Sequence, residues 1–351
     1  MNTNHIWRYP AALTVAGSDS SGGAGIQADL KTFSALGVYA ASVITAVTAQ
    51  NTRGVYAVEA VSSTLIRAQW AAVCEDLPID AVKIGMLYTA DAVRVAEEAL
   101  DRYSPVFTVL DPVLLSTSGQ VLLEKNAVAE MAKGLFPKVS LLTPNRDEAE
   151  YLTGIPIRCE ADAETAAARL LETGCAAVLI KGGHGPHTGK KENQENNEAE
   201  AAYETEVAYE TKAAYETGPI YPTYGKREET KEEEKEETVA DLLFMPGQPP
   251  RRFTARRVIT PNSHGTGCTL SSAITAYRAL GYSLPAAVEA AKLYMTAALS
   301  AGAEVRMGTG HGPVNHFFRP VPLHKIKSPG CILPKAAEGE VRKNIPYENP
   351  A

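Results

Sequence analysis

The sequence contains few cysteines and no long apolar run. Its five cysteines among 351 residues have no even spacing and include no Cys-x-x-Cys pair, which excludes a disulfide-stapled secreted domain and indicates a reducing compartment. No stretch approaches the roughly eighteen apolar residues of a membrane-spanning helix, and residues 1–10 carry no apolar run of signal-peptide length. We therefore expect a cytoplasmic protein that has no membrane partner.

Clustered positive charge is also missing. The formal net charge is −7, but residues 188–238 hold fifteen acidic and seven basic residues, which leaves the rest of the chain almost neutral. A protein that binds nucleic acid through the phosphate backbone needs a clustered cationic surface. The charge distribution therefore excludes nucleic acid as the main partner.

Residues 188–238 also interrupt an otherwise regular pattern. They are rich in charge, poor in apolar residues, and repeat Ala-Tyr-Glu-Thr three times at a spacing of six residues. Such a composition cannot bury enough surface to offset its ordering entropy, so we interpret the segment as an acidic low-complexity insertion on the surface. A tyrosine-bearing docking segment is the alternative. Several prolines in residues 319–351 predict an irregular C-terminal tail.

Short apolar runs alternate with longer helix-like segments between residues 11 and 318, as in strands and crossover helices of a mostly parallel sheet. We predict one three-layer α/β/α domain over these residues, interrupted by the insertion. The predicted strands are 12–16, 42–48, 81–84, 106–110, 139–143, 177–180, 241–244 and 252–258. The predicted helices are 25–36, 64–75, 90–103, 125–135, 147–152, 161–172, 267–280 and 284–301.

A loop with alternating glycines, residues 262–268 (NSHGTGC), opens one of these helices. Backbone N–H groups that turn inward at such a loop attract an anion together with the positive end of the helix dipole. Gly265, Thr266 and Gly267 therefore predict a phosphate cradle. Cys268 falls in the first helical turn, where we expect the pKa of its thiol to be lowered so that it can accept a proton. A flexible glycine turn with a small buried cysteine is the alternative interpretation.

A second glycine-rich loop, residues 17–29, follows the first predicted strand and fits the loose dinucleotide pattern Gly-x-Gly-x-x-Ala. A dinucleotide site needs an acidic residue at the end of the next strand to hold the ribose, but no Asp or Glu lies between Asp29 and Glu59. That strand ends near Gln50, whose amide suits an uncharged heterocycle. The sequence also has no Walker loop, so a Rossmann dehydrogenase and a P-loop nucleotide fold are both excluded.

Further polar residues follow the predicted strands at the edge where open α/β sheets bind ligands. Asp111 comes directly after one strand, and Thr143 ends the next. Asn145 and Glu148 lie on one face of a first helical turn, an arrangement that can hold a hydrated Mg²⁺, although capping is the more common use of such residues. Lys181 follows another strand, from which its side chain can reach a phosphate.

Four motifs occur in order along the chain: residues 12–29 (ALTVAGSDSSGGAGIQAD), 46–52 (AVTAQNT), 83–87 (KIGML) and 264–268 (HGTGC). Residues 309–317 (TGHGPVNHF) form a further motif. Together they closely resemble the bacterial hydroxymethylpyrimidine/phosphomethylpyrimidine kinases of thiamine biosynthesis, in the ribokinase-like superfamily. The resemblance spans residues 11–318 outside the insertion and implies a ribokinase-like fold.

The resemblance implies a reaction in two rounds. ATP phosphorylates the hydroxymethyl group of 4-amino-5-hydroxymethyl-2-methylpyrimidine, and the monophosphate is then phosphorylated to the diphosphate. Gln50, Asp29, Met86 and Gly17 are the positions that the resemblance assigns to the pyrimidine. Most sugar kinases of the superfamily carry an aspartate base at the last position of the anion-hole motif, whereas this sequence, like the resembled family, has Cys268, which we interpret as the base.

The remaining implied roles concern the phosphates and the metal. The resemblance assigns the transferred phosphoryl group to Gly265, Thr266 and Gly267, ATP to Lys181, Thr143 and Asn145, and Mg²⁺ to Asp111 and Glu148. Members of the superfamily are often dimers, so we expect a homodimer.

Two alternatives stay open at this point. A pyridoxine/pyridoxal kinase of the same superfamily shares the first glycine loop and the Gly-Thr-Gly-Cys anion hole, and a bifunctional enzyme would accept both substrates. The run Gln50-Asn51-Thr52 favours the pyrimidine. A catalytically silent binding module should have lost the anion hole, the thiol or the acidic residues, and this sequence retains all three.

Overall fold

The computed structural model describes residues 7–114, 123–182 and 237–327. Its main sheet has nine strands. They are β2 (Ala11–Asp19), β3 (Tyr39–Asn51), β4 (Gly54–Ala60), β5 (Ala81–Ile84), β6 (Thr108–Leu110), β7 (Leu141–Leu142), β8 (Val178–Ile180), β9 (Thr238–Phe244) and β10 (Arg251–Arg256).

The strands lie side by side in the order β10-β9-β8-β7-β6-β5-β2-β3-β4. The six strands from β8 to β3 run parallel to one another. At one edge β4 pairs antiparallel with β3, and at the other edge β9 and β10 continue the sheet as antiparallel strands. The carboxyl ends of the six parallel strands therefore meet at one edge of the sheet.

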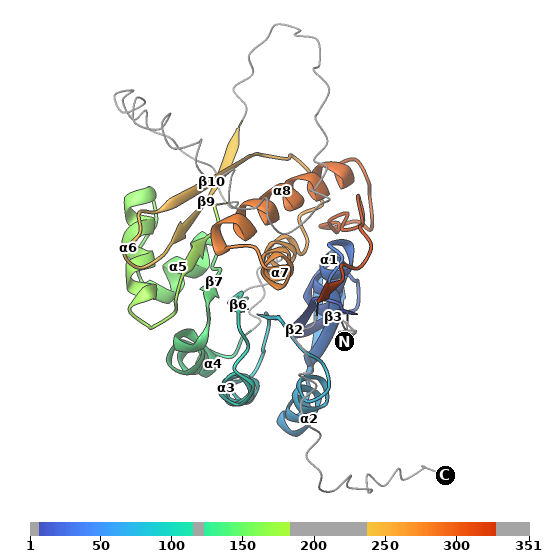
Figure 1. The fold of residues 1–351 in the computed structure, drawn as a ribbon. Helices are drawn as coiled ribbons and strands as arrows, with labels where there is room; N and C mark the ends of the chain where they lie inside the picture. The colour runs from blue at the N-terminus through green and yellow to red at the C-terminus, as the bar shows by residue number, and fades with distance from the viewer. Residues whose placement is uncertain (1–6, 115–122, 183–236, 328–351) are drawn as a thin grey trace, which may run out of the picture. The chain divides into compact units, whose positions relative to one another are not determined.

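Helices cover both faces of this sheet (Figure 1). One face packs against α1 (Gly25–Ala35), α7 (Thr266–Ala279) and α8 (Leu284–Gly302). The other packs against α2 (Ser63–Cys74), α3 (Ala90–Tyr103), α4 (Lys125–Glu130), α5 (Arg146–Thr153) and α6 (Glu160–Leu171). After α4 the chain continues through a π-helical turn, η1 (Met131–Leu135), and a 3₁₀ turn, η2 (Phe136–Lys138).

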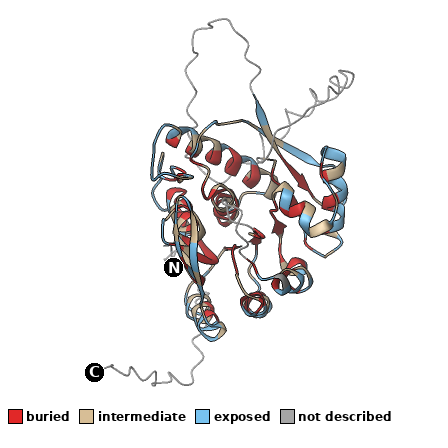
Figure 2. Cartoon of the chain, turned by 180° about the vertical axis from the view of Figure 1, so that it is seen from behind, coloured by how far each residue is buried: buried red, intermediate tan, exposed pale blue. Residues whose placement is uncertain are grey.

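Two buried apolar clusters separate the three layers, one on each face of the sheet. Successive side chains of a strand point to opposite faces, so Val82 and Ile84 of β5 enter one cluster whereas Ala81 enters the other. Because both faces are covered, every residue of β5, β6, β7 and β8 is buried. Figure 2 shows this buried centre of the sheet. The predicted three-layer α/β/α fold with a mostly parallel sheet is therefore confirmed.

Most predicted elements are present with small differences at their ends, and β5 and α3 have the predicted bounds. The predicted helix 125–135 instead changes from α to π geometry at Met131. Sequence analysis missed β4, an edge strand whose residues are all partly or fully exposed and therefore lack a strong apolar pattern. It also missed a two-stranded sheet of β1 (Trp7–Arg8) and β11 (Ile326–Lys327).

The two segments assigned outside the domain are only partly described. Of the insertion, Glu237 and Thr238 are described: Glu237 pairs with Arg257, and Thr238 begins β9. Residues 188–236 lie outside the described residues. Of the tail, residues 319–327 are described, and the N–H of Val321 donates to Ala35 O at 3.0 Å. None of the helices in the described ranges is both long and apolar enough to cross a membrane.

Candidate active site

The candidate site lies at the carboxyl edge of the parallel strands, where α7 begins. The chain passes from β2 to β3 on one side of the sheet centre and then returns to β5 on the other side of β2. Such a switch point between β2 and β5 leaves a crevice at the strand ends, and open α/β sheets bind ligands there. The residues that follow β2, β3, β5, β6, β7 and β8 all reach this edge.

The start of α7 has the geometry of an anion site. Gly265 is the N-cap with a φ of 80°, and a Cβ at this position would collide with the carbonyl oxygen of Gly23, so only glycine fits. No side chain caps the helix. The N–H of Thr266 makes only a long bond to Ser263 O at 3.4 Å. The start of α7 can therefore receive an anion at the positive end of the helix dipole.

A buried ion pair lies beside this helix start. Lys181, which follows β8, places Nζ 2.7 Å from Oδ1 of Asp111, which follows β6. Thr143 Oγ1 lies 3.3 Å from the same oxygen, and Ser271 of α7 donates to Asp111 Oδ2 at 3.3 Å. A Cβ added to Gly267 would lie 3.3 Å from Lys181 Nζ. The predicted phosphate cradle and the predicted Lys181, Thr143 and Asp111 positions are thus adjacent.

The electrostatics of Asp111 follow from this pairing. Burial acts to raise its pKa, but the charges of Lys181 and Lys83 outweigh burial and hold the pKa below its usual value. Asp111 is therefore a carboxylate at neutral pH. The pKa of Lys181 is raised in turn, because the charge of Asp111 overcomes the effect of burial.

Asn145 and Glu148 form the capping box of α5. Asn145 Oδ1 accepts from the N–H of Glu148, and Glu148 Oε2 accepts from the N–H of Asn145, both at 2.8 Å. Burial, reinforced by the charge of Asp111, raises the pKa of Glu148 to about 7. The capping role considered from the sequence is therefore present, and it leaves a carboxyl group near Asp111.

The donor set suits Mg²⁺ held mainly by water and phosphate. No cluster of three or more His, Cys, Asp or Glu side chains that could enclose a metal occurs among the described residues. Mg²⁺ keeps several waters and commonly uses one or two carboxylates together with substrate phosphates. Asp111 and Glu148 repel each other electrostatically, and a divalent cation between them would relieve that repulsion.

The pKa of the Cys268 thiol differs from the predicted one. Burial raises the pKa of Cys268 to about 11, although the charge of Lys83 acts in the opposite direction. The cost of desolvating a thiolate, together with the negative charges of Asp29 and Asp111, therefore exceeds the stabilisation from Lys83 and from the N–H of Gly25. The prediction of a lowered pKa was wrong for the protein without bound substrate, because sequence position indicates the helix dipole but not the burial.

Asp29 lies deeper than the sequence analysis assumed. Its carboxylate is fully buried and accepts from Thr14 Oγ1 at 2.6 Å, Ser272 Oγ at 2.6 Å and Lys83 Nζ at 2.9 Å. A direct contact with a bound pyrimidine would require these bonds to break. The sequence analysis did not single out Lys83, because a lysine in a short apolar strand carries no sign of its burial.

The other predicted pyrimidine positions lie near the ends of β2 and β3 and just after β5. A Cβ on Gly17 would collide with the terminal methyl of Met86, so glycine leaves space for that thioether. Thr45 of β3 donates to Met86 O at 2.6 Å, which fixes the loop after β5. Gln50 lies at the end of β3, and its N–H donates to Ser20 Oγ at 2.8 Å.

Asp19 and His264 are site residues that the sequence analysis missed. The carboxylate of Asp19 accepts from the N–H groups of Ser21, Gly23 and Ala24 at 2.8 to 3.0 Å and lies 2.8 Å from Nε2 of His264. Asp19 therefore joins the first glycine loop to the loop that opens α7. These hydrogen bonds overcome burial and lower the pKa of Asp19 to about 2. A contact across 245 positions leaves no local signal in a sequence.

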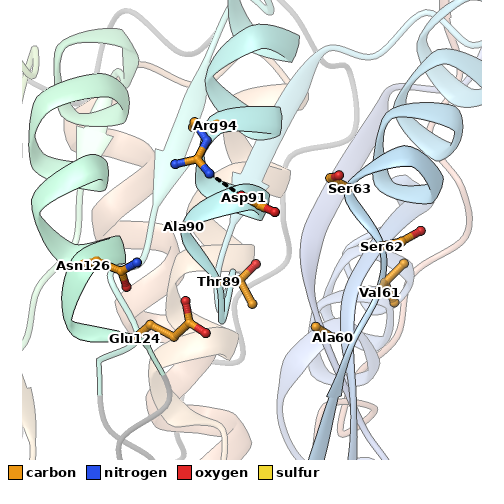
Figure 3. A pocket seen from close by; sticks show the side chains of 10 residues that line it. All are labelled: Ala60, Val61, Ser62, Ser63, Thr89, Ala90, Asp91, Arg94, Glu124 and Asn126. Atoms are coloured by element: carbon orange, nitrogen blue, oxygen red, sulfur yellow. Dashed lines mark hydrogen bonds and ion pairs between the residues drawn. The ribbon is translucent and has the colours of Figure 1, made fainter.

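A separate hollow of about 350 Å³ lies at the starts of α2, α3 and α4 (Figure 3). None of the candidate site residues lines it. The hydroxyls of Ser62 and Thr89 already cap α2 and α3, and Arg94 pairs with Asp91 of its own helix. These four side chains are therefore already engaged within their own helices, and we assign the site to the start of α7 instead.

Comparison with known proteins identifies the family of the chain. The family model described as "Phosphomethylpyrimidine kinase" matches residues 19–218 and 226–315. A hydroxymethylpyrimidine/phosphomethylpyrimidine kinase of Rhizobium meliloti (strain 1021) is 43% identical over 309 residues, which cover 88% of this chain and 97% of that protein. One from Escherichia coli (strain K12) is 41% identical, covering 87% of this chain and 97% of that protein.

Solved structures with similar folds include two kinds of kinase. A phosphomethylpyrimidine kinase of Clostridium difficile 630 is 38% identical with a TM-score of 0.62, covering 82% of this chain and 99% of that chain. An ADP complex of Bacillus subtilis pyridoxal kinase is 30% identical with a TM-score of 0.66, covering 87% of this chain and 96% of that chain. The fold similarity is alike for both kinds, but sequence identity is higher for the pyrimidine kinases. The chain belongs to the hydroxymethylpyrimidine/phosphomethylpyrimidine kinase family.

Proposed function

We propose that this protein phosphorylates 4-amino-5-hydroxymethyl-2-methylpyrimidine to its monophosphate and then to its diphosphate, with ATP as the phosphoryl donor. The observation that carries the proposal is the uncapped start of α7 beside the buried Lys181–Asp111 pair. An anion cradle next to a lysine and an acidic pair is the arrangement that phosphoryl transfer needs. Family membership supports the pyrimidine as the acceptor.

The residues divide the work between binding and charge stabilisation. The backbone N–H groups of Gly265, Thr266 and Gly267 hold the transferred phosphoryl group, where negative charge is concentrated in the transition state. Lys181, together with Thr143 and Asn145, binds the phosphates of ATP. An ADP complex and an AMP-PCP complex of related pyridoxal kinases support the use of ATP.

Asp111 and Glu148 would hold Mg²⁺ and its waters against the ATP phosphates, as their mutual repulsion and proximity indicate. When bound, Mg²⁺ neutralises charge on the phosphate oxygens. In this proposal Glu148 keeps its capping bonds to Asn145, so one of its oxygens is fixed in place by α5.

Cys268 is proposed to accept the proton of the substrate hydroxyl. The hydroxymethyl oxygen forms the new bond to the γ-phosphorus, the bond from that phosphorus to the leaving oxygen of ADP breaks, and the hydroxyl proton passes to Sγ. Because the pKa of the free thiol is about 11, Cys268 must first lose its own proton. The positive charge of Lys83, which acts to lower that pKa, favours the thiolate.

Gln50, Met86 and Gly17 are proposed to form the pyrimidine pocket. Met86 supplies an apolar contact for the ring, and Gln50 supplies the polar groups that read its edge. Asp29 supports this pocket through its bond to Lys83. A direct Asp29 contact with the substrate is the less favoured version, given the three hydrogen bonds that occupy its carboxylate.

An ADP-release assay with Mg-ATP tests the proposed function. The acceptors are hydroxymethylpyrimidine, its monophosphate and pyridoxal, each compared with a reaction without acceptor. We expect turnover on the first two and little on pyridoxal. Turnover on pyridoxal alone would assign the protein to the other kinase activity found among its structural relatives. No turnover on any acceptor would favour a binding module.

The assembly is a further part of the proposal. Family resemblance supports a cytoplasmic homodimer. Light scattering on the purified full chain measures its mass, and twice the mass of the 37.5 kDa chain is the expected value. A mass equal to one chain across the measurable concentration range would contradict the dimer.

A further inference from the structure

The side-chain amide of Gln50 lies between two groups that fix which way it faces. As placed, the amide nitrogen lies 3.2 Å from Nε2 of His264, and the amide oxygen lies 3.2 Å from Oγ1 of Thr48. The nitrogen and oxygen of such an amide have the same shape, so their positions are decided by the hydrogen bonds that each neighbour can make.

His264 can only donate from Nε2. That nitrogen lies 2.8 Å from Oδ2 of Asp19, and a carboxylate only accepts. Hydrogen bonds from His264, from the Ser21 hydroxyl and from backbone N–H groups of the first glycine loop outweigh burial and lower the pKa of Asp19 to about 2, so the carboxylate is ionised. Nε2 must therefore carry its one hydrogen and cannot accept, so an amide N–H facing it would have no partner. The amide oxygen can share that hydrogen with Asp19, and the Gln50 atom facing Nε2 is therefore the oxygen.

Thr48 leads to the same orientation independently. Its hydroxyl has one hydrogen, and its oxygen lies 2.9 Å from the carbonyl oxygen of Ser18, which can only accept. The hydroxyl donates there, so Thr48 Oγ1 is left as an acceptor. The Gln50 atom facing it must then be a donor, which is the amide nitrogen.

We infer that Asp19 and His264 are specificity-determining positioning residues, which hold the Gln50 amide with its oxygen toward His264 and its nitrogen toward Thr48. This inference rests on the proposed function and extends it. In this orientation the amide has one lone pair and one N–H left over, side by side. The leftover pair forms the face that Gln50 offers to a substrate.

A 4-aminopyrimidine matches that face. Its ring nitrogen N3 accepts and its 4-amino group donates on one edge, and a glutamine amide can contact such an edge with two hydrogen bonds, as glutamine does with adenine. Pyridoxal has no amino group beside its ring nitrogen, so that edge of its ring cannot both accept from the amide N–H and donate to the fixed amide oxygen. The fixed orientation of the Gln50 amide therefore favours the aminopyrimidine over pyridoxal as the phosphoryl acceptor.

Contacts with neighbouring loops hold both His264 and Gln50 in position. A Cβ on Gly23 would collide with the His264 ring, so the first glycine loop packs directly against it. The N–H of His264 donates to Gly312 O at 3.0 Å, and Ser20 Oγ accepts from Gln50 N at 2.8 Å. These contacts hold the backbone of Gln50 and the ring of His264, and the Asp19–His264 pair then acts on the orientation of the amide.

The test is a double-mutant cycle of His264→Phe and Gln50→Ala. His264→Phe keeps a ring against Gly23 but removes the N–H, and Asp19 still accepts from three backbone N–H groups. The readouts are the dissociation constant of free hydroxymethylpyrimidine, measured by calorimetry without ATP, and the ratio of kcat/KM for that acceptor to kcat/KM for pyridoxal. Asp19→Asn, which frees His264 to take either tautomer, is the second variant if His264→Phe folds poorly by circular dichroism.

We expect His264→Phe to weaken pyrimidine binding and to lower the kcat/KM ratio by up to about tenfold each, with kcat changed far less, as for the loss of one hydrogen bond. In the Gln50→Ala background the same substitution should have no effect on either readout. His311→Phe, at a histidine that contacts Ser263 rather than Gln50, is the matched control and should leave both readouts unchanged.

Equal effects of His264→Phe with and without Gln50 would overturn the inference, as would a fall in kcat with an unchanged ratio. Both outcomes leave the proposed function intact if the wild type still phosphorylates the pyrimidine. A wild-type protein that neither binds nor phosphorylates the pyrimidine would overturn the proposed function and this inference together.

Discussion

Cys268 is subject to opposing electrostatic effects at the scale of the single residue. Burial disfavours its thiolate, whereas the ammonium of Lys83 favours it, and burial is the larger effect in the protein alone. Lys83 is itself fully buried and keeps its charge because Asp29 lies 2.9 Å away. The ammonium of Lys83 is thus held near the thiol of Cys268, which is protonated at neutral pH in the protein alone.

This balance predicts a slow and strongly pH-dependent alkylation of Cys268. Only the thiolate reacts, so with a pKa of about 11 the rate should keep rising through pH 8 and 9 without reaching a plateau. The measurement is the rate of iodoacetamide modification of the Cys268 peptide, followed by mass spectrometry. The exposed Cys159 in the same sample is the accessibility control. A plateau below pH 8 would contradict the raised pKa.

Replacement of Cys268 tests its role as the base. Cys268→Ala should lower kcat by about a hundredfold or more, the usual contribution of a general base, while hydroxymethylpyrimidine binding is retained. Cys268→Asp supplies a carboxylate where related sugar kinases have one, and it should recover part of the rate. Turnover of Cys268→Ala within a few-fold of the wild type would remove Cys268 from the base role.

Two loops meet at the scale of the elements: the glycine-rich loop before α1 and the loop that opens α7. The carboxylate of Asp19 binds both, and Gly265 packs against the carbonyl of Gly23. The anion site therefore depends on a contact between elements that are far apart in the sequence.

The close approach of these loops predicts a large cost for Gly265→Ala. The substitution adds strain at a φ of 80° and a collision with Gly23 O. Gly154→Ala is the matched control, since Gly154 has a φ of 73° and nothing within 4 Å. We expect Gly154→Ala to lower the free energy of unfolding by about 1 kcal/mol and Gly265→Ala by clearly more, measured by urea unfolding. Equal losses would show that the loops are not in close contact.

Asp19 predicts how this loop contact depends on pH. Its folded pKa of about 2 lies below its ordinary value of 3.8, so its charge stabilises the folded state above pH 4, and this stabilisation is lost as pH falls toward 2. The linked free energy is about 2 kcal/mol at neutral pH, of which about half is lost by pH 3. Asp19→Asn should therefore be less stable than the wild type at pH 7, and the difference should shrink between pH 4 and pH 3 in urea unfolding. A constant difference over that range would exclude this role of the Asp19 charge.

The elements and the site differ in how far the sequence predicted them. Strong apolar periodicity predicted β5 and α3. It did not predict β4, because an exposed edge strand has little alternation of apolar and polar residues. The positions at strand ends were predictable because parallel strands bring their carboxyl ends together. The sequence could not predict the Asp19–His264 contact or the raised pKa of Cys268, since both depend on packing between distant segments.

At the scale of the whole molecule, the strands on either side of the insertion are directly bonded to each other. On the two sides of the segment, β8 and β9 pair antiparallel, and Gly182 N donates to Asp241 Oδ1 at 3.0 Å. Asp241 Oδ2 also accepts from Lys292 of α8 at 2.7 Å. The strands that flank residues 183–236 are thus joined by contacts among described residues alone.

Replacement of residues 185–235 by a short Gly-Ser linker should therefore preserve the fold. Loop length changes the closure entropy only slowly, so shortening this connection should cost little or add slightly to stability. We expect kcat within about twofold of the full chain and an unfolding temperature that is not lowered, measured by steady-state kinetics and calorimetry. A large fall in kcat with an unchanged unfolding temperature would instead give the segment a role in the reaction.

The central claim is that the start of α7 and the strand ends form a kinase site for the aminopyrimidine. The most direct test is a ³¹P NMR time course of the full chain with Mg-ATP and hydroxymethylpyrimidine. We predict that a phosphomonoester resonance appears first and that diphosphate resonances of the pyrimidine follow, with a matching loss of the γ-phosphate of ATP. A spectrum in which ATP is unchanged, or is hydrolysed to inorganic phosphate without any pyrimidine ester, would contradict the claim.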